Sequence, residues 1–137
     1  MDNEFGYVFL DIGSGLTFLS ALKHLSVNKK IFGVAIGNKK DKLEIELANL
    51  ADEFGLDMTR YYEILIPAIS PNFSSRNSKL ESYIREVWAS KKIPLEPIYS
   101  AKTLFTIIKY IEEKNLEGKG IYIHQGGLLS HLRYFSE

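Results

Sequence analysis

A glycine-rich turn near the start of the chain is the first candidate for chemistry. The turn Gly13-Ser14-Gly15-Leu16-Thr17 follows an apolar run and precedes a segment with helical spacing. At such a strand-to-helix turn, free backbone N–H groups and the helix dipole favour an anion, and the Ser and Thr hydroxyls can add hydrogen bonds. The turn lacks the GxxxxGK[ST] spacing of a nucleotide P-loop and also a full GxGxxG. It therefore indicates either an anion site or simply a tight turn.

The second candidate is the pair Tyr99-Ser100, which lies just before a helical segment. Pro97 has a fixed φ and helps to hold this connection in one shape. A phenol at this place could act as an acid, a base or an orienting donor. On spacing alone, a tyrosine packed beside a helix start is the favoured interpretation, because Tyr is commonly half-buried.

The third candidate is His124-Gln125-Gly126-Gly127, which follows the last apolar run. The spacing of His124 to the other two histidines suggests no set of metal ligands, and the chain has no cysteine, so we assign no metal. We expect His24 to flank a helix and His131 to lie on a surface tail.

Short apolar runs that alternate with helical stretches position these three segments. Strands are predicted over residues 7–12, 30–36, 61–66 and 120–124, and helices over about 17–25, 41–54, 80–88 and 101–113. This order predicts a three-layer α/β/α fold with a mostly parallel sheet of about four strands, in which ligands gather at the carboxyl ends of the strands. Residues 1–137 show no dividing linker and are expected to form a single domain.

Composition excludes several classes of function. At 137 residues and 45% hydrophobic content, the chain can bury one core. Seventeen basic residues balance seventeen acidic ones, so no net field recruits nucleic acid or a membrane surface. The N-terminus lacks a basic leader region, and no apolar run approaches the roughly 20 residues of a membrane span. We therefore predict a cytoplasmic protein without nucleic-acid or membrane partners.

Together, the three segments resemble the D-cysteine desulfhydrase and 1-aminocyclopropane-1-carboxylate (ACC) deaminase family. These are pyridoxal-phosphate enzymes of the tryptophan-synthase-β-like fold. The run Glu96-Pro97-Ile98-Tyr99-Ser100-Ala101-Lys102 is similar to the family's DPVY[TSE]GK pattern, and His124-Gln125-Gly126-Gly127 is similar to its H[TL]GG segment. The resemblance covers this whole chain but only the C-terminal part of a family member. It implies part of the large domain of a fold-type II pyridoxal-phosphate enzyme.

The resemblance also implies roles for individual residues. The turn formed by Gly13, Ser14, Gly15, Leu16 and Thr17 would hold the cofactor phosphate, with Leu16 where the family has a second glycine. Tyr99 would be the catalytic residue on the substrate side of pyridoxal 5'-phosphate. Ser100 would lie by the pyridine nitrogen, and Gln125 would also border the cofactor.

Ser100 and Gln125 bear on the type of reaction. A carboxylate beside the ring nitrogen keeps it protonated and strengthens the electron sink, whereas a hydroxyl does so less. Ser100 therefore favours the β-elimination of D-cysteine desulfhydrases over cyclopropane opening. Gln125 matches neither the Leu of deaminases nor the Thr of desulfhydrases, so the amino-acid substrate stays open.

The predicted loop over residues 67–77 departs from the family. Its second active-site tyrosine falls on Phe73, whereas Asn77 fits the same substrate-loop motif. Because a phenylalanine can neither donate nor accept a proton, a mechanism with two tyrosines would be impaired.

The family's Schiff-base lysine belongs to an N-terminal region that has no counterpart here, and Lys102 matches a structural lysine. We therefore expect the C-terminal fragment of an amino-acid lyase or deaminase that yields an α-keto acid and ammonia, is inactive alone and carries no covalent cofactor. Whether the chain itself is an enzyme stays open. A partial sheet would expose an edge and an apolar face, so we expect a homodimer or association with a lysine-bearing half.

Two other functions stay open from the sequence. One is a non-catalytic module that binds a phosphate ligand or a partner through the turn at residues 13–17. The other is a nucleotide-binding α/β domain, which is disfavoured because no acidic ribose partner follows a proper GxGxxG.

Overall fold

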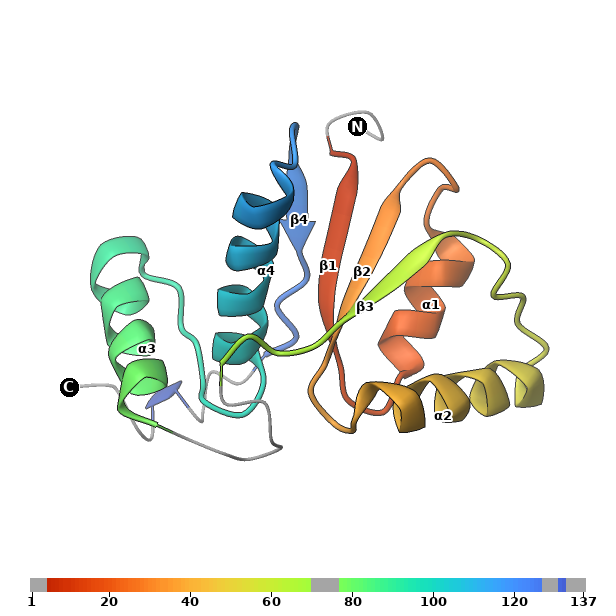
Figure 1. Ribbon diagram of the computed structural model, residues 1–137, viewed down its shortest axis with the longest axis horizontal. Coiled ribbons are helices and arrows are strands. Elements are labelled where there is room, and N and C mark those ends of the chain that lie inside the picture. The colour runs from red at the N-terminus through yellow and green to blue at the C-terminus, as the bar shows by residue number, and fades with distance from the viewer. Residues whose placement is uncertain (1–4, 70–76, 127–130, 133–137) are drawn as a thin grey trace.

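A four-stranded parallel sheet forms the centre of the molecule (Figure 1). The computed structural model describes residues 5–69, 77–126 and 131–132. The strand order is β3-β2-β1-β4. The strands are β1 (Tyr7–Ile12), β2 (Lys30–Ala35), β3 (Tyr62–Leu65) and β4 (Gly120–Tyr122), and the helices are α1 (Leu16–His24), α2 (Lys40–Glu53), α3 (Ser78–Lys91) and α4 (Ser100–Lys114).

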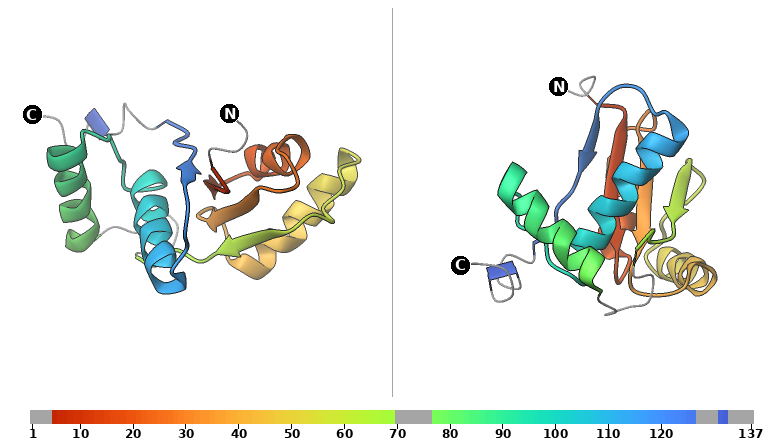
Figure 2. Two further views of the ribbon diagram at one scale, coloured as in Figure 1. Left: turned by 90° about the horizontal axis from the view of Figure 1, so that it is seen from above. Right: turned by 60° about the vertical axis from the view of Figure 1, so that its left-hand side comes forward.

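The layers follow from the alternation of side chains along the buried strands. Val8, Leu10 and Ile12 of β1 pack in one core with α1 and α2. Phe9, between them, faces the opposite side and packs in a core that includes Ile107 of α4. Helices on both faces therefore cover the sheet, which confirms the predicted three-layer α/β/α fold (Figure 2).

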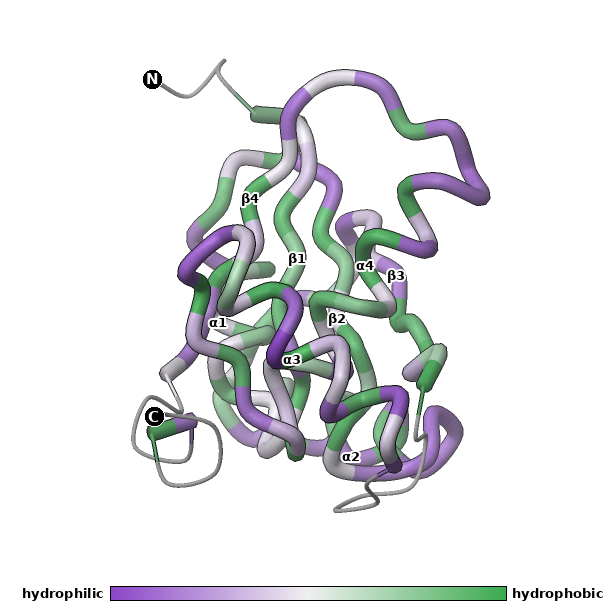
Figure 3. The backbone as a smooth tube through the Cα atoms, turned by 90° about the vertical axis from the view of Figure 1, so that its left-hand side faces the viewer, coloured by the Kyte–Doolittle hydropathy of each residue, from purple (hydrophilic) through white to green (hydrophobic). Residues whose placement is uncertain are grey.

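Helix α3 does not pack against the sheet. Its buried residues Leu80, Ile84 and Val87 pack with Ala101 of α4 rather than with the strands. In Figure 2, α3 accordingly lies on the side of α4 that is remote from the sheet. The hydrophobic colouring along β1 and β2 in Figure 3 shows where the main core lies.

A close approach between α1 and the sheet depends on a glycine of β2. A Cβ atom on Gly33 would lie 2.3 Å from Cδ1 of Ile12 and 2.7 Å from Cε1 of Phe18. Real side chains do not tolerate such distances, so Gly33 makes room for α1 to pack against β1 and β2. Phe18, in the first turn of α1, is thereby fixed beside the end of β1.

β4 is shorter than predicted. The sequence predicts a strand over residues 120–124, but the strand ends at Tyr122. One further sheet bond follows, from the Ile123 amide to the Phe9 carbonyl at 2.9 Å. Beyond this bond the chain leaves the sheet, and His124 contacts the Pro94 carbonyl, with 2.8 Å between Nε2 and the oxygen. No helix in the described ranges is both long and apolar enough to cross a bilayer.

Candidate functional site

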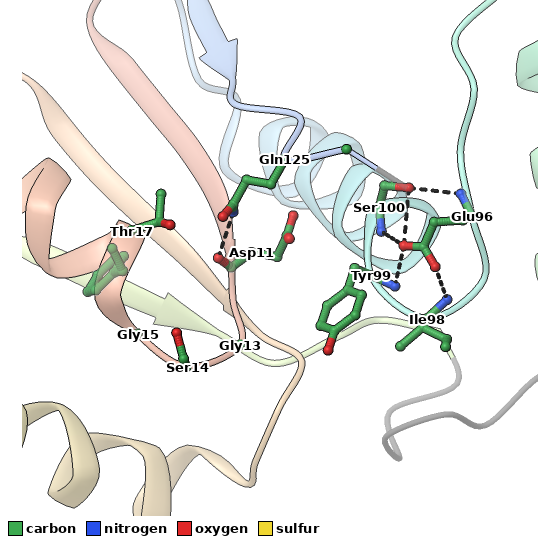
Figure 4. A pocket seen from close by; sticks show the side chains of 12 residues that line it. Asp11, Gly13, Ser14, Gly15, Thr17, Glu96, Ile98, Tyr99, Ser100 and Gln125 are labelled. Atoms are coloured by element: carbon green, nitrogen blue, oxygen red, sulfur yellow. Dashed lines mark hydrogen bonds between the residues drawn. The ribbon is translucent and has the colours of Figure 1, made fainter. Parts of the chain in front are cut away.

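A cavity of about 390 Å³ lies at the carboxyl ends of β1 and β4 (Figure 4). Its volume falls in the range of about 300–1,000 Å³ that is usual for small-molecule sites. Three segments that are far apart in the sequence form its walls, and all three contain residues that the sequence singled out. The lining residues are Asp11, Gly13, Ser14, Gly15, Thr17, Phe18, Glu96, Ile98, Tyr99, Ser100, Gln125 and Gly126.

The first wall is the turn between β1 and α1. Gly15 is the residue that caps the N-terminus of α1, and its φ of 96° is in the left-handed region that favours glycine. The first intrahelical bond runs from the Leu19 amide to the Gly15 carbonyl at 2.9 Å. No described side chain caps this end, and the first turn carries no acidic residue. The Leu16 amide makes only a long contact, 3.5 Å from its nitrogen to Ser14 Oγ, within the described residues. The N-terminus of α1 is therefore open to an anion.

The N-terminus of α4 borders the same cavity but is closed by its own carboxylate. Glu96 Oε1 accepts hydrogen bonds from the amides of Tyr99 and Ser100, both at 2.7 Å, and Oε2 accepts one from the amide of Ile98 at 2.8 Å. The Glu96 side chain is 4% exposed. Because Glu96 already occupies these donors, an anion in the cavity is directed to α1 rather than to α4.

Tyr99 and Ser100 lie at the junction between these two walls. A Cβ atom on Gly13 would lie 3.6 Å from Cε1 of Tyr99, so the phenol ring borders the glycine turn. Tyr99 is 37% exposed. Ser100 is buried, and its Oγ accepts a hydrogen bond from the Glu96 amide at 2.8 Å. The serine hydroxyl thus contributes to the start of α4 as well as to the wall of the cavity.

The third wall comes from β1 and the segment after β4. Gln125 donates from Nε2 to the backbone carbonyl of Asp11 at 3.0 Å, which fixes the amide side chain at the end of β1. Tyr122 donates from its hydroxyl to Oδ1 of Asp11, also at 3.0 Å. The pKa of the Asp11 carboxyl is raised, chiefly by burial and to a small extent by the negative charge of Glu96, although the hydrogen bond from Tyr122 acts in the opposite direction. Burial and the nearby Asp11 charge also raise the pKa of Tyr122.

Sequence reasoning missed Asp11 and Glu96 as parts of the site. Asp11 is the one charged residue in the run Tyr7 to Ile12, and that interruption is the signal that could have found it. Glu96 belongs to the motif that carried the resemblance, but its capping role depends on how the chain turns into α4. Phe18 also lines the cavity and has no distinctive sequence signal. Ile98 and Gly126 line it too, and both belong to the motifs named above, although the sequence assigned them no role.

The structure does not bring the other predicted residues into the cavity wall. The side chain of Leu16 is 53% exposed and does not line the cavity. Asn77 caps α3 by accepting a hydrogen bond from the Leu80 amide at 2.8 Å. Phe73 lies outside the described residues. Lys102 is buried in α4, outside the lining set, and burial lowers the pKa of its ammonium while Glu96 raises it.

Two histidines position the segment that precedes Glu96. His124 contacts the Pro94 carbonyl, and His131 Nδ1 lies 2.7 Å from the Leu95 carbonyl. The expectation that His131 lies on the surface is wrong, because it is 1% exposed and packs against Trp88. His24 is the last residue of α1, as expected. The described residues contain no group of three or more His, Asp or Glu side chains that could hold a metal ion.

The fold of this chain is similar to that of proteins of known structure. The chain shares its fold with an ACC deaminase homologue. That crystal structure superposes with a TM-score of 0.78 over 98% of this chain, at 21% sequence identity. The match covers 43% of the homologue, so the chain spans less than half of the length of the protein it resembles. Neither a protein-family profile nor a curated protein matches the sequence.

Proposed function

We propose that this chain is the C-terminal portion of the cofactor-binding domain of a pyridoxal-phosphate-dependent amino-acid lyase or deaminase. One observation carries the proposal: the glycine turn, Tyr99, Ser100 and Gln125 come from separate segments and meet in a single cavity. The likeness to the ACC deaminase homologue supports it at the level of the fold. The same residues are those that the family resemblance assigns to the cofactor.

The cavity residues fit the two parts of pyridoxal phosphate that bind without a covalent bond to the protein, the phosphate and the aromatic ring. The open N-terminus of α1, with the hydroxyls of Ser14 and Thr17 beside it, suits a phosphate. The adjacent space beside Tyr99 suits an aromatic ring, because the phenol provides an apolar face and a polar tip. No lysine occurs among the described residues that line the cavity, so we propose that another chain segment supplies the Schiff-base lysine.

In this proposal, bound pyridoxal phosphate supplies an electron sink for breaking bonds at the substrate's α- and β-carbons. The turn at residues 13–17 anchors the phosphate and thereby fixes the position of the ring. Tyr99 presents its phenol at the wall of the cavity, where it can orient a substrate or transfer a proton. Gln125 is held in place by its bond to the Asp11 carbonyl and can donate or accept at the opposite wall.

We further propose that the intact enzyme is closer to D-cysteine desulfhydrases than to ACC deaminases. Ser100 provides a hydroxyl where the resemblance places the group nearest the pyridine nitrogen, and deaminases carry a carboxylate there. The reaction would then be β-elimination from a small amino acid, giving an α-keto acid and ammonia.

Binding of pyridoxine 5'-phosphate tests the proposal without covalent chemistry. This compound has an alcohol in place of the aldehyde, so it cannot form a Schiff base with surface lysines. We expect saturable binding by calorimetry that is at least about tenfold tighter than the binding of pyridoxine, because the phosphate gains charge-assisted hydrogen bonds. Equal affinity for the two compounds would contradict a phosphate site.

Two glycine variants provide a matched pair for this titration. Gly15 and Gly55 both have positive φ, but only Gly15 lies in the turn, whereas a Cβ on Gly55 would meet nothing within 4 Å. We expect Gly15→Ala to weaken phosphate-dependent binding about tenfold or more and Gly55→Ala to leave it unchanged.

With pyridoxal phosphate itself, borohydride reduction and peptide mapping should reveal no specific lysine adduct. A single adduct would show that the chain carries its own Schiff-base lysine.

We also propose that a second copy of the chain, or a lysine-bearing half, covers one edge of the sheet. In the described part of the chain, β3 and β4 each pair with only one neighbour, and Ile121 of β4 is 41% exposed. Analytical ultracentrifugation should therefore show a dimer, or a complex once the other half is added. A monodisperse monomer that binds little hydrophobic dye would argue against this arrangement.

A further inference from the structure

The cavity has two ends of opposite electrostatic character. The open N-terminus of α1 attracts negative charge at one end. Asp11 presents a carboxylate from β1, and Figure 4 shows this side chain between the glycine turn and the start of α4. Although Glu96 also lines the cavity, three backbone amides already bind its two oxygens. Asp11 is therefore the carboxylate that the cavity offers to a ligand.

Among the residues that the structure describes, no cation compensates the negative charge of Asp11. The titratable groups that face it are Tyr122 on β4 and Glu96 before α4, and neither is a cation. Within the described residues, no Lys, Arg or His forms an ion pair with Asp11. Asp11 is nevertheless only 8% exposed. A carboxylate at such a place is costly unless a cation accompanies it, and a ligand can bring that cation.

We propose that Asp11 binds a protonated nitrogen on a ligand whose phosphate lies at the N-terminus of α1. For pyridoxal phosphate that nitrogen belongs to the ring, so the inference rests on the function proposed above. The cavity then selects a ligand with a phosphate and a cationic nitrogen rather than any phosphate ester. In this arrangement the partner of the ring nitrogen comes from β1. The family resemblance assigned that contact to Ser100, whose hydroxyl oxygen accepts a hydrogen bond from the Glu96 amide.

A carboxylate in this position changes the expected chemistry of the ring. A negative charge near the ring nitrogen favours its protonated form, and each tenfold difference in preference corresponds to about one pKa unit. The protonation of the ring nitrogen would then depend on Asp11 as well as on the hydroxyl of Ser100. The electron sink would be stronger than a serine at that place implies.

The test follows the ring nitrogen of bound, ¹⁵N-labelled pyridoxine 5'-phosphate by NMR over a pH series, with the full 137-residue chain. We expect its pKa to rise above that of the free ligand. In Asp11→Asn the pKa should fall by roughly one unit, and the affinity at neutral pH should drop roughly tenfold. Benzyl phosphate, which has no ring nitrogen, is the matched ligand, and its affinity should stay unchanged or increase when Asp11 is replaced.

Each outcome decides the inference. A bound ligand whose nitrogen titrates at or below the free value in the unmodified chain overturns it, even if the Asp11→Asn variant does not fold. Equal losses of affinity for pyridoxine 5'-phosphate and benzyl phosphate in the variant also overturn it. In either case phosphate-dependent binding would persist in the unmodified chain, and the proposed function would stand. Failure of pyridoxine 5'-phosphate to bind the unmodified chain would instead remove both.

Discussion

Replacing Glu96 with alanine is expected to lower the free energy of unfolding by about 3 kcal/mol. A single capping side chain contributes about 0.5–2 kcal/mol, and each buried donor left unpaired costs about 1–3 kcal/mol. Glu96 satisfies three amides at 2.7–2.8 Å and is almost fully buried, so its loss combines both costs. Urea unfolding at neutral pH, with the midpoint and slope fitted separately, measures the change.

Two further variants calibrate this expectation. Glu96→Gln keeps one acceptor oxygen and should lose about half as much stability. Asn77→Ala removes the side-chain oxygen that accepts a hydrogen bond from the Leu80 amide and should cost about 1 kcal/mol. If Glu96→Ala were no more destabilising than Asn77→Ala, the three short contacts would contribute little to the start of α4. Glu96 would then not bind these amides strongly enough to close the N-terminus of α4 to other anions.

Much of the fold could be predicted from the sequence because the helix and strand patterns are local. Apolar runs near residues 7–12 and 30–36 produce β1 and β2, and spacing such as Leu43, Leu47 and Ala51 produces the buried side of α2. The packing of α3 could not be predicted in the same way. Periodicity shows that α3 has an apolar stripe, but not that the stripe faces α4 instead of the sheet.

In the candidate site, too, local motifs could be predicted from the sequence, whereas contacts that depend on tertiary packing could not. The glycine turn, Tyr99, Ser100 and Gln125 were predictable because each belongs to a short motif with its own signal, and the structure brings them to one cavity. The sequence places Asp11 in an apolar run and does not reveal its role, because that role arises only where α4 and β4 approach β1. The burial of His131 is not predictable for a similar reason, since only tertiary packing brings it to the Leu95 carbonyl.

The ligand-free chain should become more stable when Asp11 is replaced with asparagine. Burial raises the pKa of this carboxyl above its usual 3.8, so the folded chain holds a proton more tightly than the unfolded chain does. The stability that Asp11 contributes is therefore fully present below pH 3.8 and is lost as the pH rises through its folded-state pKa. Asparagine cannot ionise, and its side-chain oxygen can still accept the Tyr122 hydrogen bond. At neutral pH we expect a gain on the order of 1 kcal/mol or more.

Chemical unfolding of both chains over a pH series checks this sign. The two stabilities should converge at the acid end and separate as the pH rises, with the variant above. Asp41→Asn is the matched control. Asp41 is exposed in the first turn of α2, where its negative charge interacts favourably with the helix dipole. That substitution should cost a few tenths of a kcal/mol.

A variant at Asp11 that is less stable at neutral pH would mean that the carboxylate holds the fold together. A more stable variant that has lost its preference for a protonated ligand would mean that the fold keeps Asp11 at the expense of stability, as binding sites commonly do.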